Sequence, residues 1–116
     1  MRLVKVKNTN RDTVIGDRIE VADTSSTRLF GLLGKKHLDT GKGLWIKPSS
    51  GVHTFFMSIP IDVIGLDKNR KIVKLWPNLV PWRVTSVSTR LHSVVELPAG
   101  RIAECNTQLG DTLSIE

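Results

Sequence analysis

The longest apolar run in the sequence is Val52-His53-Thr54-Phe55-Phe56-Met57-Ser58-Ile59-Pro60-Ile61-Asp62-Val63-Ile64-Gly65-Leu66-Asp67. Many of its residues are β-branched or aromatic, a composition that favours a β-strand over an α-helix. Proline is tolerated at the first position of a strand but not in its middle, so Pro60 predicts two extended pieces that join at residues 58–60. A strand that is apolar on both faces must be covered on both faces. We therefore expect a central strand, with buried side chains at Ile59, Ile61, Val63, Ile64 and Leu66.

Two hairpins are predicted around this run. Residues 1–22 alternate apolar with polar side chains on both sides of a turn-forming segment at 8–12, a pattern typical of an opening hairpin. After the central strand, a polar turn at 67–70 predicts that residues 61–66 pair with residues 71–76. Further strands are expected at 43–47, 91–97 and 112–115.

Two short helices are also predicted. The first covers residues 27–33, which follow several potential N-cap residues and precede Gly34, a natural helix stop. The second is expected to start near Pro98, because the first helical turn does not need the missing N–H of proline. It should end at Cys105. Its inward-facing side chains would be Ala99, Ile102 and Cys105.

The chain as a whole predicts one α+β domain over residues 1–116. Its 116 residues, 40% of them hydrophobic, suffice to bury a core without metal ions or disulfides. We expect a mainly antiparallel β structure with a compact barrel-like or sandwich core and two short helices. Pro77 and Pro81 exclude an interior strand over residues 76–83, which we interpret as an ordered excursion over the surface.

Composition narrows the class of protein. Residues 1–7 alternate charged with aliphatic side chains and lack the apolar block of a signal peptide, and no segment is long enough to span a bilayer. A single cysteine, Cys105, excludes an intramolecular disulfide and a cysteine-rich zinc site, and we interpret it as a buried, inert thiol. We therefore expect a soluble cytoplasmic protein that binds no membrane.

The formal net charge of +6 raises the possibility of nucleic-acid binding. The lysines and arginines are nevertheless scattered from Arg2 to Arg101, and the few aromatic residues lie in apolar contexts, so no platform for base stacking is visible. A solvated basic surface is the simpler interpretation. Weak, salt-sensitive binding to nucleic acid remains an alternative.

Several separated motifs resemble those of DUF192, a family of small bacterial and archaeal proteins of unknown function. The motifs are residues 53–67, then Pro81-Trp82-Arg83, then Val95-Glu96-Leu97-Pro98-Ala99-Gly100 with a trailing Gly110-Asp111, preceded by Gly31-Leu32-Leu33-Gly34 and Gly43-Leu44-Trp45-Ile46. The similarity covers about residues 27–116, with the N-terminal hairpin at 1–22 ahead of it. The resemblance implies a compact, mostly β domain and brings no established activity, cofactor or catalytic residue.

Asp62 is the most unusual residue of the central run. An unpaired buried carboxylate is strongly disfavoured, so Asp62 must find a partner in Arg83, in His53 or in main-chain N–H groups. An ion pair with Arg83 would tie the 76–83 excursion to the central strand. We hypothesise a shallow cleft there that binds a small molecule or a peptide in a non-enzymatic module. Its residues would be His53, Phe55, Met57, Asp62, Trp82 and Arg83.

A second hypothesis is a small hydrolase or transferase in which His53 acts as a base that Asp62 orients. No Gly-x-Ser-x-Gly nucleophile motif accompanies the pair, and no catalytic residue is assigned. His37 and His92 occur in unrelated contexts, so no metal site and no cofactor are expected. Glu96 ends a strand just before the second helix, and we interpret it as structural, favoured by the positive end of that helix.

Overall fold

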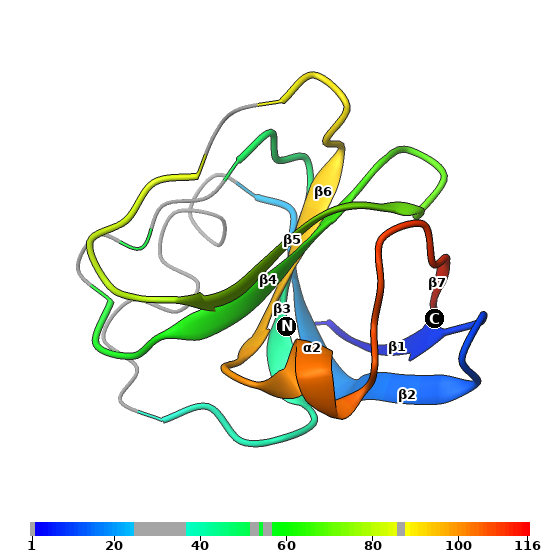
Figure 1. The fold of residues 1–116 in the computed structure, drawn as a ribbon, viewed down its shortest axis with the longest axis horizontal. Helices are drawn as coiled ribbons and strands as arrows, with labels where there is room; N and C mark the ends of the chain where they lie inside the picture. The colour runs from blue at the N-terminus through cyan, green and yellow to red at the C-terminus, as the bar shows by residue number, and fades with distance from the viewer. Residues whose placement is uncertain (1, 25–36, 52–53, 55–56, 86–87) are drawn as a thin grey trace.

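The computed structural model describes residues 2–24, 37–51, 54, 57–85 and 88–116. Its seven strands form one sheet in the order β5-β4-β6-β3-β2-β1-β7, and the sheet curls into a half-barrel (Figure 1). The described part of the chain contains one short helix, α2 (Arg101–Glu104). The strands are β1 (Leu3–Asn8), β2 (Thr13–Ala22), β3 (Lys42–Ile46), β4 (Ile61–Leu66), β5 (Ile72–Leu79), β6 (Ser93–Pro98) and β7 (Leu113–Ile115).

The sheet is mainly antiparallel, as the sequence predicts. Strands β1 and β2 form the opening hairpin, and β4 and β5 form the second hairpin. Only β2 and β3, among the paired strands of the structure, run parallel. A parallel pair cannot be joined by a tight turn, and residues 23–41 make this connection. The helix expected at 27–33 lies outside the described residues.

Strand β4 has the interior position that its apolar sequence predicts. It lies between β5 and β6, and each of its residues is buried. Ile64 and Leu66 belong to one core cluster, together with Ile102 of α2, whereas Ile61 and Val63 belong to a second cluster on the opposite face. Ile59, expected to be buried, is only partly so because it precedes the strand.

The segment after the second hairpin differs from the prediction. Strand β5 does not stop at Trp76 but continues through Pro77 to Leu79. Proline is compatible with this strand because β5 lies at the edge of the sheet, where one side of its backbone has no neighbouring strand. Ile61 pairs with Leu79 and Val63 with Trp76, so Pro77 and Asn78 both lie opposite the single residue Asp62, which makes a β-bulge.

The start of α2 also corrects the prediction. Pro98 is the last residue of β6, where it pairs with Ile61, and is not part of the helix. The chain turns at Gly100, the N-cap, whose φ of +93° is accessible to glycine at little cost. The helix therefore begins later than expected, at Arg101. Ile102 and Cys105 are buried as predicted, but Ala99 lies in the turn before the helix and is exposed.

Candidate functional site

Asp62 is buried, and both of its carboxylate oxygens accept main-chain N–H groups. Its side chain is 1% exposed, and its Oδ1 and Oδ2 accept hydrogen bonds from the N–H groups of Asn78 and Ile102, both at 2.8 Å. No ion pair within the described residues includes Asp62, so the expected pairing with Arg83 is not formed. Of the partners considered from the sequence, main-chain N–H groups are the ones observed. Asp62 thus connects β4 to the bulge of β5 and to the first turn of α2.

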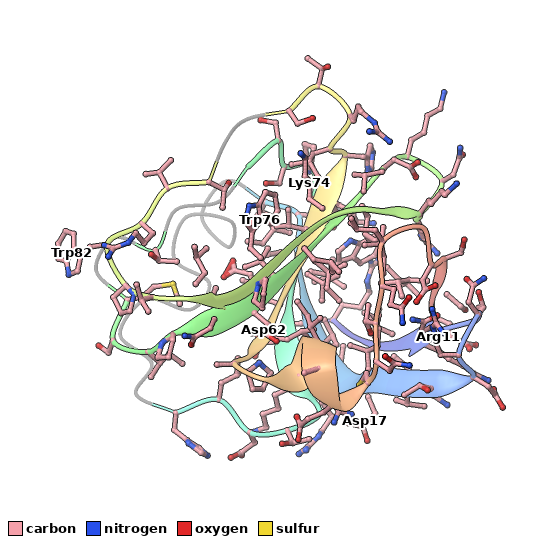
Figure 2. All side chains as sticks on the ribbon, in the orientation of Figure 1. Arg11, Asp17, Asp62, Lys74, Trp76 and Trp82 are labelled. Atoms are coloured by element: carbon pink, nitrogen blue, oxygen red, sulfur yellow. The ribbon has the colours of Figure 1, made fainter. Side chains whose placement is uncertain are left out.

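The sheet separates Asp62 from Met57. Asp62 lies opposite Leu97 and shares the face of Ile64, which α2 covers. Met57 packs with Ile61 and Val63 on the other face. Figure 2 shows Asp62 beside α2 and Trp82 at a distant edge of the molecule. The structure therefore does not bring Asp62 together with Met57 or Trp82, and His53 and Phe55 lie outside the described residues.

Thr54 is a residue whose role the sequence reasoning missed. Its side chain is fully buried, its hydroxyl donates to the carbonyl of Val80 at 2.7 Å, and the same oxygen accepts the N–H of Arg83 at 2.8 Å. The main chain of Thr54 adds two more hydrogen bonds to this part of the chain, from its own N–H to the carbonyl of Arg83 and from the N–H of Trp82 to its carbonyl. The available signal was a hydroxyl inside an apolar run, because a buried hydroxyl requires a partner.

This anchored segment presents an aromatic side chain to solvent. Trp82 has a φ of +65° and a side chain that is 56% exposed, and Val84 is 62% exposed. A positive φ is an outlier for a bulky residue and costs about 1–3 kcal/mol, so the surrounding hydrogen bonds must impose it. Arg83 is exposed, and its guanidinium donates to the carbonyl of Trp82. Residues 80–85, hereafter the Trp82 segment, therefore form a loop of defined conformation.

Met57 is hydrogen-bonded to Thr54, the residue that anchors this segment. Its side chain is 6% exposed and lies in the second core cluster, and its N–H donates to the carbonyl of Thr54. The thioether is therefore core and not a surface contact. Within the sequence-predicted cleft, Trp82 and Arg83 are the described residues that are open to a ligand.

Glu96 lies in an apolar environment. In β6 it faces Leu44 of β3 and Val63 of β4, with 5% of its surface exposed. Burial raises the pKa of its carboxyl group to about 8, so the group is protonated at neutral pH. Ile102, at the start of α2, packs on the opposite face of the sheet, so the expected interaction of Glu96 with that helix is wrong. Asp62, and not Glu96, is the carboxylate that interacts with the start of α2, by accepting the N–H of Ile102.

The thiol of Cys105 is buried, as the sequence predicts. Burial raises the pKa of the Cys105 thiol, which keeps it in the unreactive protonated form. Within residues 2–24, 37–51, 54, 57–85 and 88–116, no group of three or more potential ligands could hold a metal ion. No helix in the same ranges is long and apolar enough to cross a membrane.

Comparison with known proteins places these features in a family context. The model of the DUF192 family, described as Uncharacterized ACR, matches residues 4–115. A UPF0127 protein of Thermococcus sibiricus is 32% identical over 94% of this chain and 73% of its own length. The UPF0127 protein PF1050 of Pyrococcus furiosus is 36% identical over 83% of this chain and 86% of its own length. The crystal structure of a protein of unknown function from Novosphingobium aromaticivorans has the same fold as this chain, with a TM-score of 0.82 and 24% sequence identity. The match covers 97% of this chain and 83% of that protein.

Proposed function

Because the chain belongs to the DUF192 family, an uncharacterised family, we propose a function from its own geometry: it is a non-enzymatic module that binds a peptide or small molecule at the Trp82 segment. Trp82 is the anchor that enters an apolar pocket of the ligand or packs against its apolar part. Arg83 is the neighbouring charge that recognises a carboxylate. Asp62, Thr54 and Met57 hold the segment and its underlying strands and do not contact the ligand.

One observation carries this proposal: Trp82 is held in a strained conformation that leaves most of its side chain in solvent. A tryptophan gains free energy from burial, so the outward conformation of Trp82 gives up stabilisation that contact with a ligand would recover. Here the hydrogen bonds of Thr54 impose the outward conformation. A preorganised loop loses little conformational entropy on binding, and tryptophan and arginine are enriched among residues that dominate binding energy.

The geometry of Asp62 supports a binding role over the enzymatic alternative. A base–orienter pair requires a carboxylate oxygen directed at the histidine. Both oxygens of Asp62 already accept main-chain N–H groups, and the carboxylate lies on the face of the sheet that α2 covers. Asp62 is thus better suited to hold the fold than to orient His53.

The proposal is tested by selecting binders from a short random-peptide display library against the intact chain. Selected peptides should bind Trp82→Ala about 30-fold or more weakly, because an anchor side chain contributes roughly 2 kcal/mol or more. Leu109→Ala is the matched control, because Leu109 is also an exposed apolar residue, at 63%, and lies in the turn before β7. Failure to select any binder, or binders that tolerate Trp82→Ala as well as Leu109→Ala, would refute the role of the Trp82 segment.

A further inference from the structure

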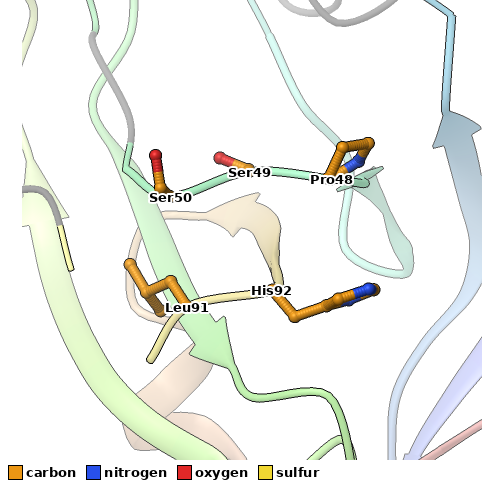
Figure 3. Close-up of a pocket in the computed structure, with 5 residues that line it drawn as sticks. All are labelled: Pro48, Ser49, Ser50, Leu91 and His92. Carbon is orange, nitrogen blue, oxygen red and sulfur yellow. The ribbon is translucent and has the colours of Figure 1, made fainter. Parts of the chain in front are cut away.

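A second concave surface lies away from the Trp82 segment, around Leu91 and His92. Two hollows meet at these residues. One, of about 280 Å³, is bordered by Pro48, Ser49 and Ser50 (Figure 3). The other, of about 500 Å³, is lined by Asp67, Lys68, Asn69, Thr89 and Arg90 in addition to the two shared residues. The larger hollow falls within the range of about 300–1,000 Å³ that is usual for small-molecule sites.

The backbone around these hollows is held in place by hydrogen bonds. The N–H of His92 donates to the carbonyl of Leu66 at 2.8 Å, and the N–H of Ser49 donates to the carbonyl of His92 at 2.9 Å. The turn after β4 is closed by the Oδ1 of Asp67, which accepts the N–H groups of Asn69 and Lys71. A ligand would therefore meet walls that are already formed, which lowers the entropic cost of binding.

The floor of the hollows is apolar and depends on a glycine. Leu91 is 7% exposed and packs over Gly65 of β4. A Cβ atom at Gly65 would lie 2.5 Å from the Cδ2 of Leu91, so a larger residue there would displace the leucine. Gly65 thus leaves room for Leu91 to pack on β4, where its side chain is the apolar residue shared by both hollows.

The lining of the larger hollow carries more positive than negative charge. Lys68 and Arg90 border it from different loops, and His92 adds an imidazole. Within the described residues, no ion pair involves any of these three, whereas other basic side chains, such as Lys7 and Arg11, pair with Asp12 and Asp111. The one carboxylate in the lining, Asp67, already accepts two N–H groups.

We propose that this surface, the His92 hollow, is a binding site for a small phosphomonoester. An ammonium, a guanidinium, an imidazole, the Asn69 amide and the Thr89 hydroxyl all donate hydrogen bonds to anionic oxygens, and arginine does so in a bidentate manner. The apolar side chain of Leu91 suits the organic part of the ligand. The site shares no residue with the Trp82 segment and does not depend on the function proposed for that segment.

The experiment is a titration of the intact chain with ribose 5-phosphate, followed by the backbone amide resonances in two-dimensional NMR. Saturable shifts are expected at Lys68, Arg90 and His92, and ribose alone should cause none. Lys68→Ala and Arg90→Ala should each weaken binding about tenfold, the usual effect of losing one charged hydrogen bond. Lys5→Ala and Arg2→Ala are matched controls that remove the same charge from exposed positions at the β1 end of the sheet and should leave the affinity unchanged.

Several outcomes would overturn the proposal. Shifts that do not saturate, or that ribose reproduces, would show that the phosphate is not recognised. Equal weakening in the Lys5→Ala and Arg2→Ala controls would show a response to net charge alone. A single-stranded oligonucleotide that displaces ribose 5-phosphate, binds far more tightly and depends on basic residues across the whole surface would indicate nucleic-acid binding instead. None of these results would affect the peptide selection on Trp82.

Discussion

The carboxylate of Asp62 in β4 accepts the main-chain N–H of Ile102 at the start of α2, at a distance of 2.8 Å. These residues are 40 positions apart in sequence, and this contact joins the helix to an interior strand. A second N–H, that of Asn78, donates to the other oxygen from the bulge in β5. One buried side chain thus connects β4 both to the bulge in β5 and to the start of α2.

The first prediction distinguishes the main-chain hydrogen bonds of Asp62 from the ion pair with Arg83 that was expected from the sequence. Asp62→Ala should lower the free energy of unfolding by about 2–4 kcal/mol, because it leaves two N–H groups without their acceptor. Arg83→Ala should cost less than about 0.5 kcal/mol, since Arg83 is exposed and makes no ion pair with Asp62. Denaturant unfolding of both variants and of the double variant should give a coupling energy near zero. A large coupling energy would reinstate the Asp62–Arg83 pair.

The second prediction concerns pH and Glu96. The pKa of this group rises from an ordinary 4.5 to about 8 in the folded chain, so between these values the unfolded chain releases a proton that the folded chain retains. The free energy of unfolding should therefore fall as pH rises from about 4.5 to 8, by roughly 1.4 kcal/mol per pH unit from this group.

Glu96→Gln provides the control for this prediction, because glutamine resembles the protonated acid in shape but cannot lose a proton. Denaturant midpoints of the variant should be nearly independent of pH over the same window, and the variant should be the more stable protein at its upper end. Parallel curves for the two proteins would contradict the protonated, buried state of Glu96.

The third prediction tests the interior position of β4. Val63 has no exposed surface, so Val63→Ala should lower the free energy of unfolding by about 1–3 kcal/mol through lost burial and a residual cavity. Val14→Ala in β2 is the matched control, because Val14 is 37% exposed and should tolerate the change with a loss below about 0.5 kcal/mol. Equal denaturant midpoints for the two variants would refute the assignment.

The fourth prediction addresses the conformation of the Trp82 segment. Thr54→Val keeps the shape of the side chain but removes the hydroxyl that binds Val80 and Arg83, so the amide of Arg83 should exchange with solvent faster and stability should fall by about 1–3 kcal/mol. Thr54→Ser retains the hydroxyl and should preserve the protection of Arg83. If Thr54→Val leaves hydrogen exchange at Arg83 unchanged, the hydroxyl does not hold the segment.

Local patterns alone were enough to predict much of the sheet. The alternation in residues 1–22 and the polar turn at 67–70 specify two hairpins because each pairs neighbours in sequence. The nearly continuous apolar sequence of β4 indicated burial on both faces, because a strand with apolar side chains on both faces is stable only where both faces are covered. The spacing of Ile102 and Cys105 likewise placed both side chains in the core.

The candidate site depended on relationships that no local pattern contains. The sequence shows that Asp62 needs a partner. Whether that partner is a cation or main-chain N–H groups depends on how a helix and a bulged edge strand, both distant in sequence, pack against it. The two faces of β4 separate Met57 from Asp62 because successive side chains of a strand point in opposite directions. A polar residue in an apolar run therefore indicates that a hydrogen-bond partner is required. Which atoms provide the hydrogen bonds is determined by the packing of segments that are remote in sequence.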